Sequence, residues 1–102
     1  MADVRGGQEF ALLPMFGTVL STQVSVGTTA TVLPASALAD RRSMVIRHQG
    51  TNSIFLGGSG VTTGNGFELK TDDMVAADLD DGALIYGIVA SGTETAGVLE
   101  VS

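Results

Sequence analysis

The sequence contains no cysteine and no tryptophan, and only five of its 102 residues are lysine or arginine. The absence of thiols excludes disulfides, cysteine nucleophiles and thiolate metal sites. Five basic against eleven acidic residues leave a formal net charge of −6, so the chain lacks the dense positive surface that nucleic-acid binding requires. An acidic surface also disfavours anionic membranes. We therefore expect protein partners, with no nucleic acid and no membrane.

Long apolar runs and good helix formers are also scarce. No apolar run approaches the ~20 residues of a membrane-spanning helix, and no basic segment followed by an apolar one predicts a signal peptide. Gly, Thr, Ser and Val are abundant, which favours strands and turns. Apolar residues nevertheless make up 44% of the chain. Because a domain of this length has a thin core, we expect part of that apolar surface to contact a partner.

Residues 1–18 are predicted to form an extended N-terminal arm. Gly6 and Gly7 interrupt any regular element, and an apolar run follows over residues 10–16. Pro14 within this run excludes a central strand or a helix interior. So apolar a segment either packs on its own domain or lies along a neighbouring subunit. Its partner-contact candidates are Phe10, Leu12, Leu13, Met15 and Phe16.

Residues 19–102 are predicted to form a single β domain. From Val19 to Val26 apolar and polar residues alternate, which indicates a strand with one buried face. Pro34 ends the next β-branched run, and residues 34–40 are predicted to form a loop with one helical turn. Residues 43–49 and 54–56 are predicted to pair as a hairpin. Phe67 and Leu69 are expected to face inward, and residues 71–81 to form a solvated acidic loop. Residues 84–90 are predicted to form a central strand covered on both sides, and residues 98–101 a last strand.

Short strands separated by turn signals predict an all-β fold. The Asn65-Gly66 and Asp81-Gly82 pairs are such turn signals. Their spacing suits a small antiparallel β-sandwich or barrel, jelly-roll-like, with the arm extending from its N-terminus.

No group of residues predicts catalysis, a cofactor or a metal site. The glycine-rich stretch 57–66 lacks the lysine of a P-loop and the third glycine of a dinucleotide fingerprint. Asp78, Asp80 and Asp81 lack the bidentate glutamate that closes a calcium loop. His48 is the single histidine, too few for a zinc site, and we expect it to make ordinary hydrogen bonds at a strand end.

Much of the chain after Val19 resembles a group of small virion proteins of tailed bacteriophages. The shared features are a Leu-Pro-Ala segment, a basic strand entry, an aromatic hairpin of the Ile-Gly-Gly-Ser type, an Asn-Gly turn and two closing strands. Such proteins often carry Asn at the hairpin entry, where this chain has His48. The matching stretches are residues 29–36, 41–46, 50, 54–62, 65–69, 84–93 and 98–100.

The resemblance implies a non-enzymatic structural protein, first of all a capsid decoration (cement) protein. Such proteins typically form homotrimers at the local threefold positions of the shell and clamp neighbouring major capsid proteins. The resemblance thus implies the major capsid protein or other virion proteins as partners, and the capsid surface as location after synthesis in the host cytoplasm. Arg41 and Arg42 are further partner-contact candidates, because a neutral-to-acidic neighbour could pair with them.

Other functions stay open at this point. A component of the tail, the baseplate or the head–tail junction would share the same sequence features. A host-surface or glycan recognition module would use the same architecture, although its loops would be expected to carry exposed aromatics, and these loops carry mainly Gly, Ser, Thr and Asp. An enzyme would need a nucleophile, a base and an orienting group, which the sequence does not offer together.

Overall fold

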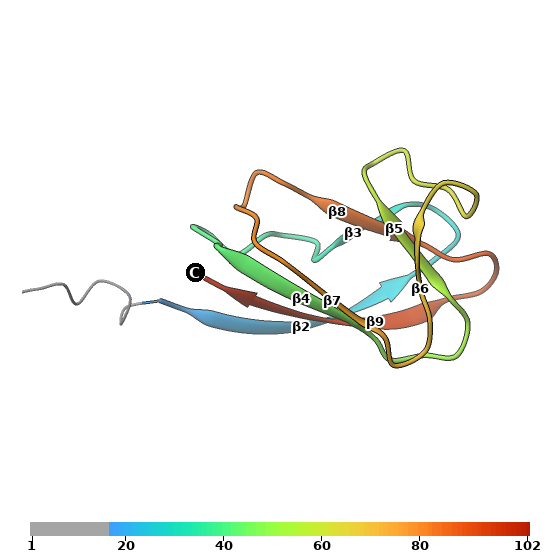
Figure 1. The fold of residues 1–102 in the computed structure, drawn as a ribbon, viewed down its shortest axis with the longest axis horizontal. Coiled ribbons are helices and arrows are strands. Elements are labelled where there is room, and N and C mark those ends of the chain that lie inside the picture. The colour runs from blue at the N-terminus through green and yellow to red at the C-terminus, as the bar shows by residue number, and fades with distance from the viewer. Residues whose placement is uncertain (1–16) are drawn as a thin grey trace, which may run out of the picture.

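The computed structural model describes residues 17–102, which form eight β-strands and no helix (Figure 1). Each strand is short, and the connections are turns and loops. The described residues accordingly contain no helix that could cross a membrane. The strands are β2 (Val19–Val26), β3 (Thr31–Leu33), β4 (Ser43–His48), β5 (Ile54–Gly57), β6 (Phe67–Leu69), β7 (Met74–Ala77), β8 (Ile85–Ile88) and β9 (Glu94–Val101).

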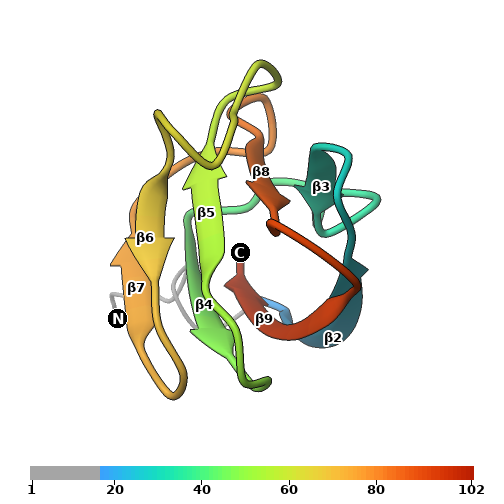
Figure 2. The same cartoon turned by 90° about the vertical axis from the view of Figure 1, so that its right-hand side faces the viewer.

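The strands make two four-stranded sheets, in the orders β2-β9-β4-β7 and β3-β8-β5-β6. Every ladder is antiparallel, and the pairs β2–β9, β3–β8, β4–β7 and β5–β6 are nested within one another along the chain. This is the strand pairing of a jelly roll, in which one long hairpin is wrapped around. Successive strand pairs of that hairpin lie alternately in one sheet and in the other. Figures 1 and 2 both place β3 and β8 in the layer opposite β2 and β9. The all-β, jelly-roll-like prediction is confirmed.

The predicted alternation in β2 is confirmed from Ser21 to Val26, whereas Leu20, on the predicted inward face, is 42% exposed. Val24 and Val26 turn towards the interior while Ser21, Gln23 and Ser25 are exposed. β9 lies beside β2 over its whole length, from Val19 opposite Val101 to Val26 opposite Glu94. The core lies between the two sheets, and its buried members are Val26, Leu33, Met44, Ile46, Ile54, Leu56, Leu69, Val89, Ala96 and Val98.

Gly87 leaves room in the middle of β8 for core side chains from both sheets. A Cβ atom there would lie 3.1 Å from Leu33 Cδ1 and 3.2 Å from Ile54 Cγ2 in the same sheet, and 3.4 Å from Val26 Cγ1 in the opposite sheet. A side chain at this position would therefore have to displace these core residues slightly.

The predicted hairpin of residues 43–49 and 54–56 is wrong. β4 pairs with β7 and β9, whereas β5 belongs to the other sheet and pairs with β6 and β8. The turn between them therefore carries the chain from one sheet to the other. Two adjacent strands with a short connection favour a hairpin, but here both are already paired with strands from the second half of the chain.

Three further predictions also need correction. Leu69 is buried as predicted, but Phe67 is 63% exposed. The acidic segment is not all loop, since β7 forms within it over Met74–Ala77. β8 is central in its sheet, but its outward side chains are only half-buried within this chain.

Residues 34–40 contain no helical turn in the structure. The loop is organised by polar contacts instead, and Asp40 adopts a positive φ of 59°.

The predicted arm lies almost wholly outside the described residues. Phe10, Leu12, Leu13, Met15 and Phe16 are among the undescribed positions. The structure begins at Gly17, and the Thr18 amide donates to Ser102 Oγ at 2.8 Å while the Ser102 amide donates to the Thr18 carbonyl at 2.9 Å. The first described residues are thus held against the last one.

Leu69 and Phe67 project from the same face of β6, but Leu69 is buried and Phe67 is 63% exposed, so the two residues test where the core ends along this strand. Leu69→Ala is expected to lower the free energy of unfolding by about 2–5 kcal/mol, because a fully enclosed side chain is lost. Phe67→Ala is expected to change it by less than about 0.5 kcal/mol, since its ring is mostly in solvent. Urea unfolding at constant m-value measures both losses. Similar losses for the two variants would contradict the position of Phe67 outside the core.

Candidate functional site

The inward face of β9 is apolar in the middle and acidic at both ends. Ala96 and Val98 lie in the core, flanked by Glu94 and Glu100, which are 9% and 0% exposed. Buried carboxylates are rare and need partners. The two glutamates therefore mark the two places in the described domain where polar chemistry is concentrated.

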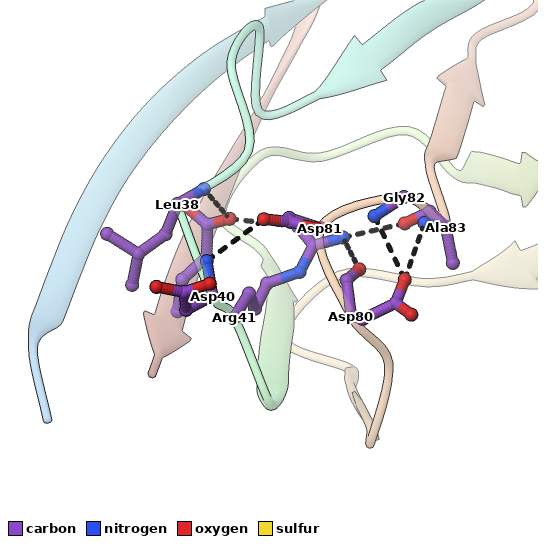
Figure 3. Close-up of polar contacts among 8 residues, drawn as sticks. Leu38, Asp40, Arg41, Asp80, Asp81, Gly82 and Ala83 are labelled. Carbon is purple, nitrogen blue, oxygen red and sulfur yellow. Dashed lines mark hydrogen bonds and ion pairs between the residues drawn. The ribbon is translucent and has the colours of Figure 1, made fainter.

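Glu100 forms an ion pair with Arg41 that is fully enclosed. Arg41 Nη1 lies 2.8 Å from Glu100 Oε2, and both side chains have no exposed surface. The same carboxylate oxygen accepts the amide of Leu38 at 3.0 Å. Arg41 Nη2 donates to the carbonyls of Asp80 and Ala83, at 2.8 and 2.6 Å (Figure 3). One guanidinium thus joins the end of β9 to the loop between β7 and β8.

Aspartate side chains complete this polar cluster from outside. The Asp80 carboxylate accepts the amides of Gly82 and Ala83, at 2.9 and 3.2 Å, and so closes the turn at the predicted Asp-Gly signal. Asp81 Oδ2 accepts the amide of Asp40 at 2.9 Å, which links this turn to the loop before β4 (Figure 3). The acidic segment therefore organises loops, and its carboxylates are used on backbone amides.

Arg41 was predicted as a contact for a partner, and the structure contradicts this. Its guanidinium is turned inward and is already bonded to Glu100 and two carbonyls. A side chain that is 2% exposed cannot pair with a neighbouring molecule. Arg42, the next residue, is exposed, and its role as a partner contact stays a prediction.

His48 and Glu94 form the second polar cluster, at the opposite end of the same sheet face. His48 is fully buried; its Nδ1 accepts the Gly50 amide at 2.8 Å and its Nε2 contacts the Asn52 carbonyl. The first contact requires a lone pair on Nδ1, so the proton is on Nε2, which donates to Asn52. The prediction of an ordinary strand-end histidine is confirmed.

Glu94 holds the same turn from the other strand. Its Oε1 accepts the amide of Thr51 at 2.8 Å, and its Oε2 accepts the side-chain amide of Asn52 at 3.2 Å. The hydrogen bond from the Thr51 amide, opposed by desolvation, lowers the pKa of Glu94 below its usual range. The carboxylate is thus kept in its charged form as a turn fastener.

The glycine-rich stretch of residues 57–66 also has a structural role in the described domain. In the glycine-rich stretch, the Thr62 amide donates to Asn65 Oδ1 at 2.8 Å, and Val61 is buried beneath. Across residues 17–102, no group of three or more His, Asp or Glu side chains could hold a metal ion. The loop therefore presents a self-bonded turn rather than a phosphate cradle.

A solvent-facing hollow of about 240 Å³ lies on the outer face of the β2-β9-β4-β7 sheet. We call it the outer groove. Local sequence patterns do not predict it, because its lining residues come from four strands that are distant along the chain. Residues lining it include Gln23, Val45, Arg47, Met74, Gly97 and Leu99.

Comparison of the chain with protein-family models, with curated proteins and with solved structures found no match.

The Arg41–Glu100 pair is expected to behave as a buried, coupled pair. Arg41→Met leaves the Glu100 carboxylate enclosed without its counter-charge and should cost about 3–5 kcal/mol of unfolding free energy. Glu100→Met strands the guanidinium and should cost a similar amount. The double variant should lose less than the sum of the two, because neither charge is then left unpaired.

Arg47→Met provides the matched control for this cycle. Arg47 pairs with Asp72 at 3.3 Å, with side chains 50% and 72% exposed, and exposed pairs contribute only about 0–1 kcal/mol. Chemical denaturation of the four variants measures the cycle. Strictly additive losses at positions 41 and 100 would show that the two charges do not interact.

Glu94 predicts a pH dependence of stability. Since its pKa is lower in the folded chain than the ordinary value of 4.5, it contributes stability at pH values above 4.5, and that contribution is lost as the pH falls through the lowered value. Glu94→Gln should therefore reduce the loss of stability below pH 4.5. Asp78→Asn, which removes an exposed carboxyl, is the control for the change in net charge. Equal acid sensitivity of wild type and Glu94→Gln would refute the prediction.

Proposed function

We propose that this chain is a non-enzymatic structural protein of a tailed-phage virion, and specifically a capsid decoration protein. In this role it binds the outer surface of the capsid as an oligomer and stabilises the shell. The proposal rests first on the sequence resemblance to small virion proteins. The fold is in keeping with it, since eight-stranded jelly rolls occur in viral capsid domains, and also in lectins and cupins. Because a fold alone does not define function, the choice among these depends on the side chains.

The observation that carries the proposal is how the buried polar side chains are used. Arg41, His48, Glu94 and Glu100 are the buried polar or charged residues of the described domain. Each of them bonds backbone groups of a loop or turn, and none of them lines the outer groove. An active site needs such groups directed at a substrate. Here they fasten loops to strands, which is the chemistry of a rigid structural module.

The outward apolar surface supports a binding role. Val19, Met74 and Leu99 are 66%, 66% and 40% exposed and lie on the same outer face. Exposed large apolar side chains that gather on one face are typical of interaction surfaces. An assembly of such domains on a shell would cover this surface.

A glycan recognition module is the competing class, and the described aromatic residues argue against it. Phe67 is the one aromatic among the exposed large apolar side chains of residues 17–102, whereas Tyr86 is half-buried in β8. Glycan binding by ring stacking would require aromatics grouped on the loops. A tail or baseplate component remains the alternative within the structural class, since it would need the same rigid domain.

Binding to capsid shells is the direct test. Purified protein is mixed with shells of the phage whose genome encodes it, after accessory proteins have been removed, and the shells are pelleted. We expect saturable binding at a copy number that matches the threefold positions of the shell, and greater resistance of the loaded shells to heat. A variant lacking residues 1–16 should keep the urea unfolding transition of the β domain and bind the shells more weakly.

Two results would contradict the decoration role. Folded protein that does not sediment with the shells, but does sediment with isolated tails, would place it in the tail instead. Specific binding on a glycan panel, without binding to either particle, would support the recognition module. Arg42→Ala is a useful companion variant, because Arg42 is exposed and its loss should not affect folding.

A further inference from the structure

The Asn65-Gly66 pair lies in the loop between β5 and β6, and the structure requires both residues there. Asn65 Oδ1 accepts the amide of Thr62 at 2.8 Å, which closes the turn. A Cβ atom on Gly66 would lie 2.6 Å from Phe55 Cβ and 3.0 Å from Val61 Cγ2. Because β5 and the loop itself already fill this space, no side chain fits at position 66 without displacing them.

An asparagine that is followed by glycine can lose its side-chain amide without an enzyme. The Gly66 backbone nitrogen gives up its proton to solvent and attacks Asn65 Cγ. The bond between Cγ and Nδ2 breaks, and ammonia leaves after taking a proton from solvent. Water then opens the cyclic succinimide at one of its two carbonyls and gives aspartate or isoaspartate. Glycine favours the attack because it has no side chain that would crowd its nitrogen.

The closed turn opposes this reaction through hydrogen bonds to Thr62. The Gly66 amide donates to the Thr62 carbonyl at 2.9 Å, so the proton that must be lost is bound. The Asn65 side chain points back to the Thr62 amide, whereas the attack needs its Cγ against the nitrogen of the next residue. The Asn65 amide donates to Thr62 Oγ1 at 3.2 Å. Ring closure therefore requires the turn to open.

We propose that Asn65 is a site of spontaneous deamidation whose rate is set by the opening of this turn. Thr62 and Asn65 are exposed, so water has access to the site. Opening an exposed loop costs less free energy than unfolding the domain, and the reaction therefore proceeds in the folded protein in proportion to the open fraction. This inference does not depend on the virion role.

The two products have different effects on the domain. Aspartate at position 65 keeps an oxygen that accepts the Thr62 amide, so the turn is retained and one negative charge is added to the net charge of −6. Isoaspartate inserts a methylene into the main chain directly before Gly66, where Phe55 and Val61 leave no room. We expect isoaspartate to weaken the pairing of β6 with β5, which starts at the next residue.

Peptide mapping of the aged protein tests the proposal. The full chain is incubated at mildly alkaline pH, in buffer and in urea above its unfolding transition. Mass spectrometry follows the peptide that contains Asn65, and chromatography separates aspartate from isoaspartate. We expect both products in buffer, and a rate at least about tenfold higher in urea, because the turn no longer protects the site. Asn52, the only other asparagine, precedes Ser53 and should react more slowly in both samples, since the serine side chain crowds the attacking nitrogen.

Thr62→Ala and Thr62→Ser are a matched pair for the role of the turn. Thr62→Ala removes the hydroxyl that accepts the Asn65 amide and should raise the rate in buffer about two- to tenfold, the usual effect of one hydrogen bond. Thr62→Ser keeps the hydroxyl and should leave the rate within about twofold. In urea both variants should react at the wild-type rate, because the turn is absent there.

Each of three results would overturn the proposal. Equal rates at Asn65 in buffer and in urea would show that the turn does not protect the site. A rate that rises only at the global unfolding transition would show that the folded protein does not react through local opening. Equal rates in buffer for Thr62→Ala and Thr62→Ser would show that the hydrogen bond from Asn65 to Thr62 does not control the opening.

Discussion

The buried ion pair between Arg41 and Glu100 is the constraint on which one end of the domain depends. Removing both charges from water is costly, and their attraction offsets that cost only with additional hydrogen bonds. Leu38, Asp80 and Ala83 supply those bonds from two loops. The pair therefore dictates where these loops lie, and any change in their path would leave a charge enclosed without partners. Its two remaining polar atoms, Arg41 Nε and Glu100 Oε1, have no partner in the described chain, which makes the cluster still less tolerant of change.

β9 connects this polar cluster to the core and to the neighbouring strands of its sheet. It lies between β2 and β4, with which it makes the longest ladders of the protein. Its inward residues are a glutamate, two small or medium apolar residues and a second glutamate. The apolar pair closes the core while each glutamate holds a loop at one end, Glu100 through Arg41 and Glu94 through the turn at Thr51. β9 thus contributes both to the packing of the sheets and to the placement of the loops.

How far the sequence predicts this structure depends on the range of the interactions. Alternation in β2 from Ser21 to Val26 and the position of His48 follow from local pattern, and both predictions are confirmed. The hairpin of residues 43–49 and 54–56 failed because pairing in a jelly roll joins strands that are far apart in sequence, and local turn signals carry no information about such partners. Arg41 failed for the same reason. Its partner Glu100 is 59 positions away, and nothing near Arg41 distinguishes a buried arginine from an exposed one.

The orientation of β9 also leaves apolar side chains on the outer face of its sheet. A strand with one solvent face is expected to turn its acidic side outward and its apolar side inward. In β9 the side that bears Glu94 and Glu100 faces the core, and the side that bears Leu99 and Val101 faces out. Each buried glutamate is compensated by hydrogen bonds, Glu100 with Arg41 and Leu38, and Glu94 with Thr51 and Asn52. The outward side has no such compensation in the single domain, because the Leu99 side chain is 40% exposed to water. A partner bound on the outer face, as expected of the proposed decoration role, would remove that apolar surface from water.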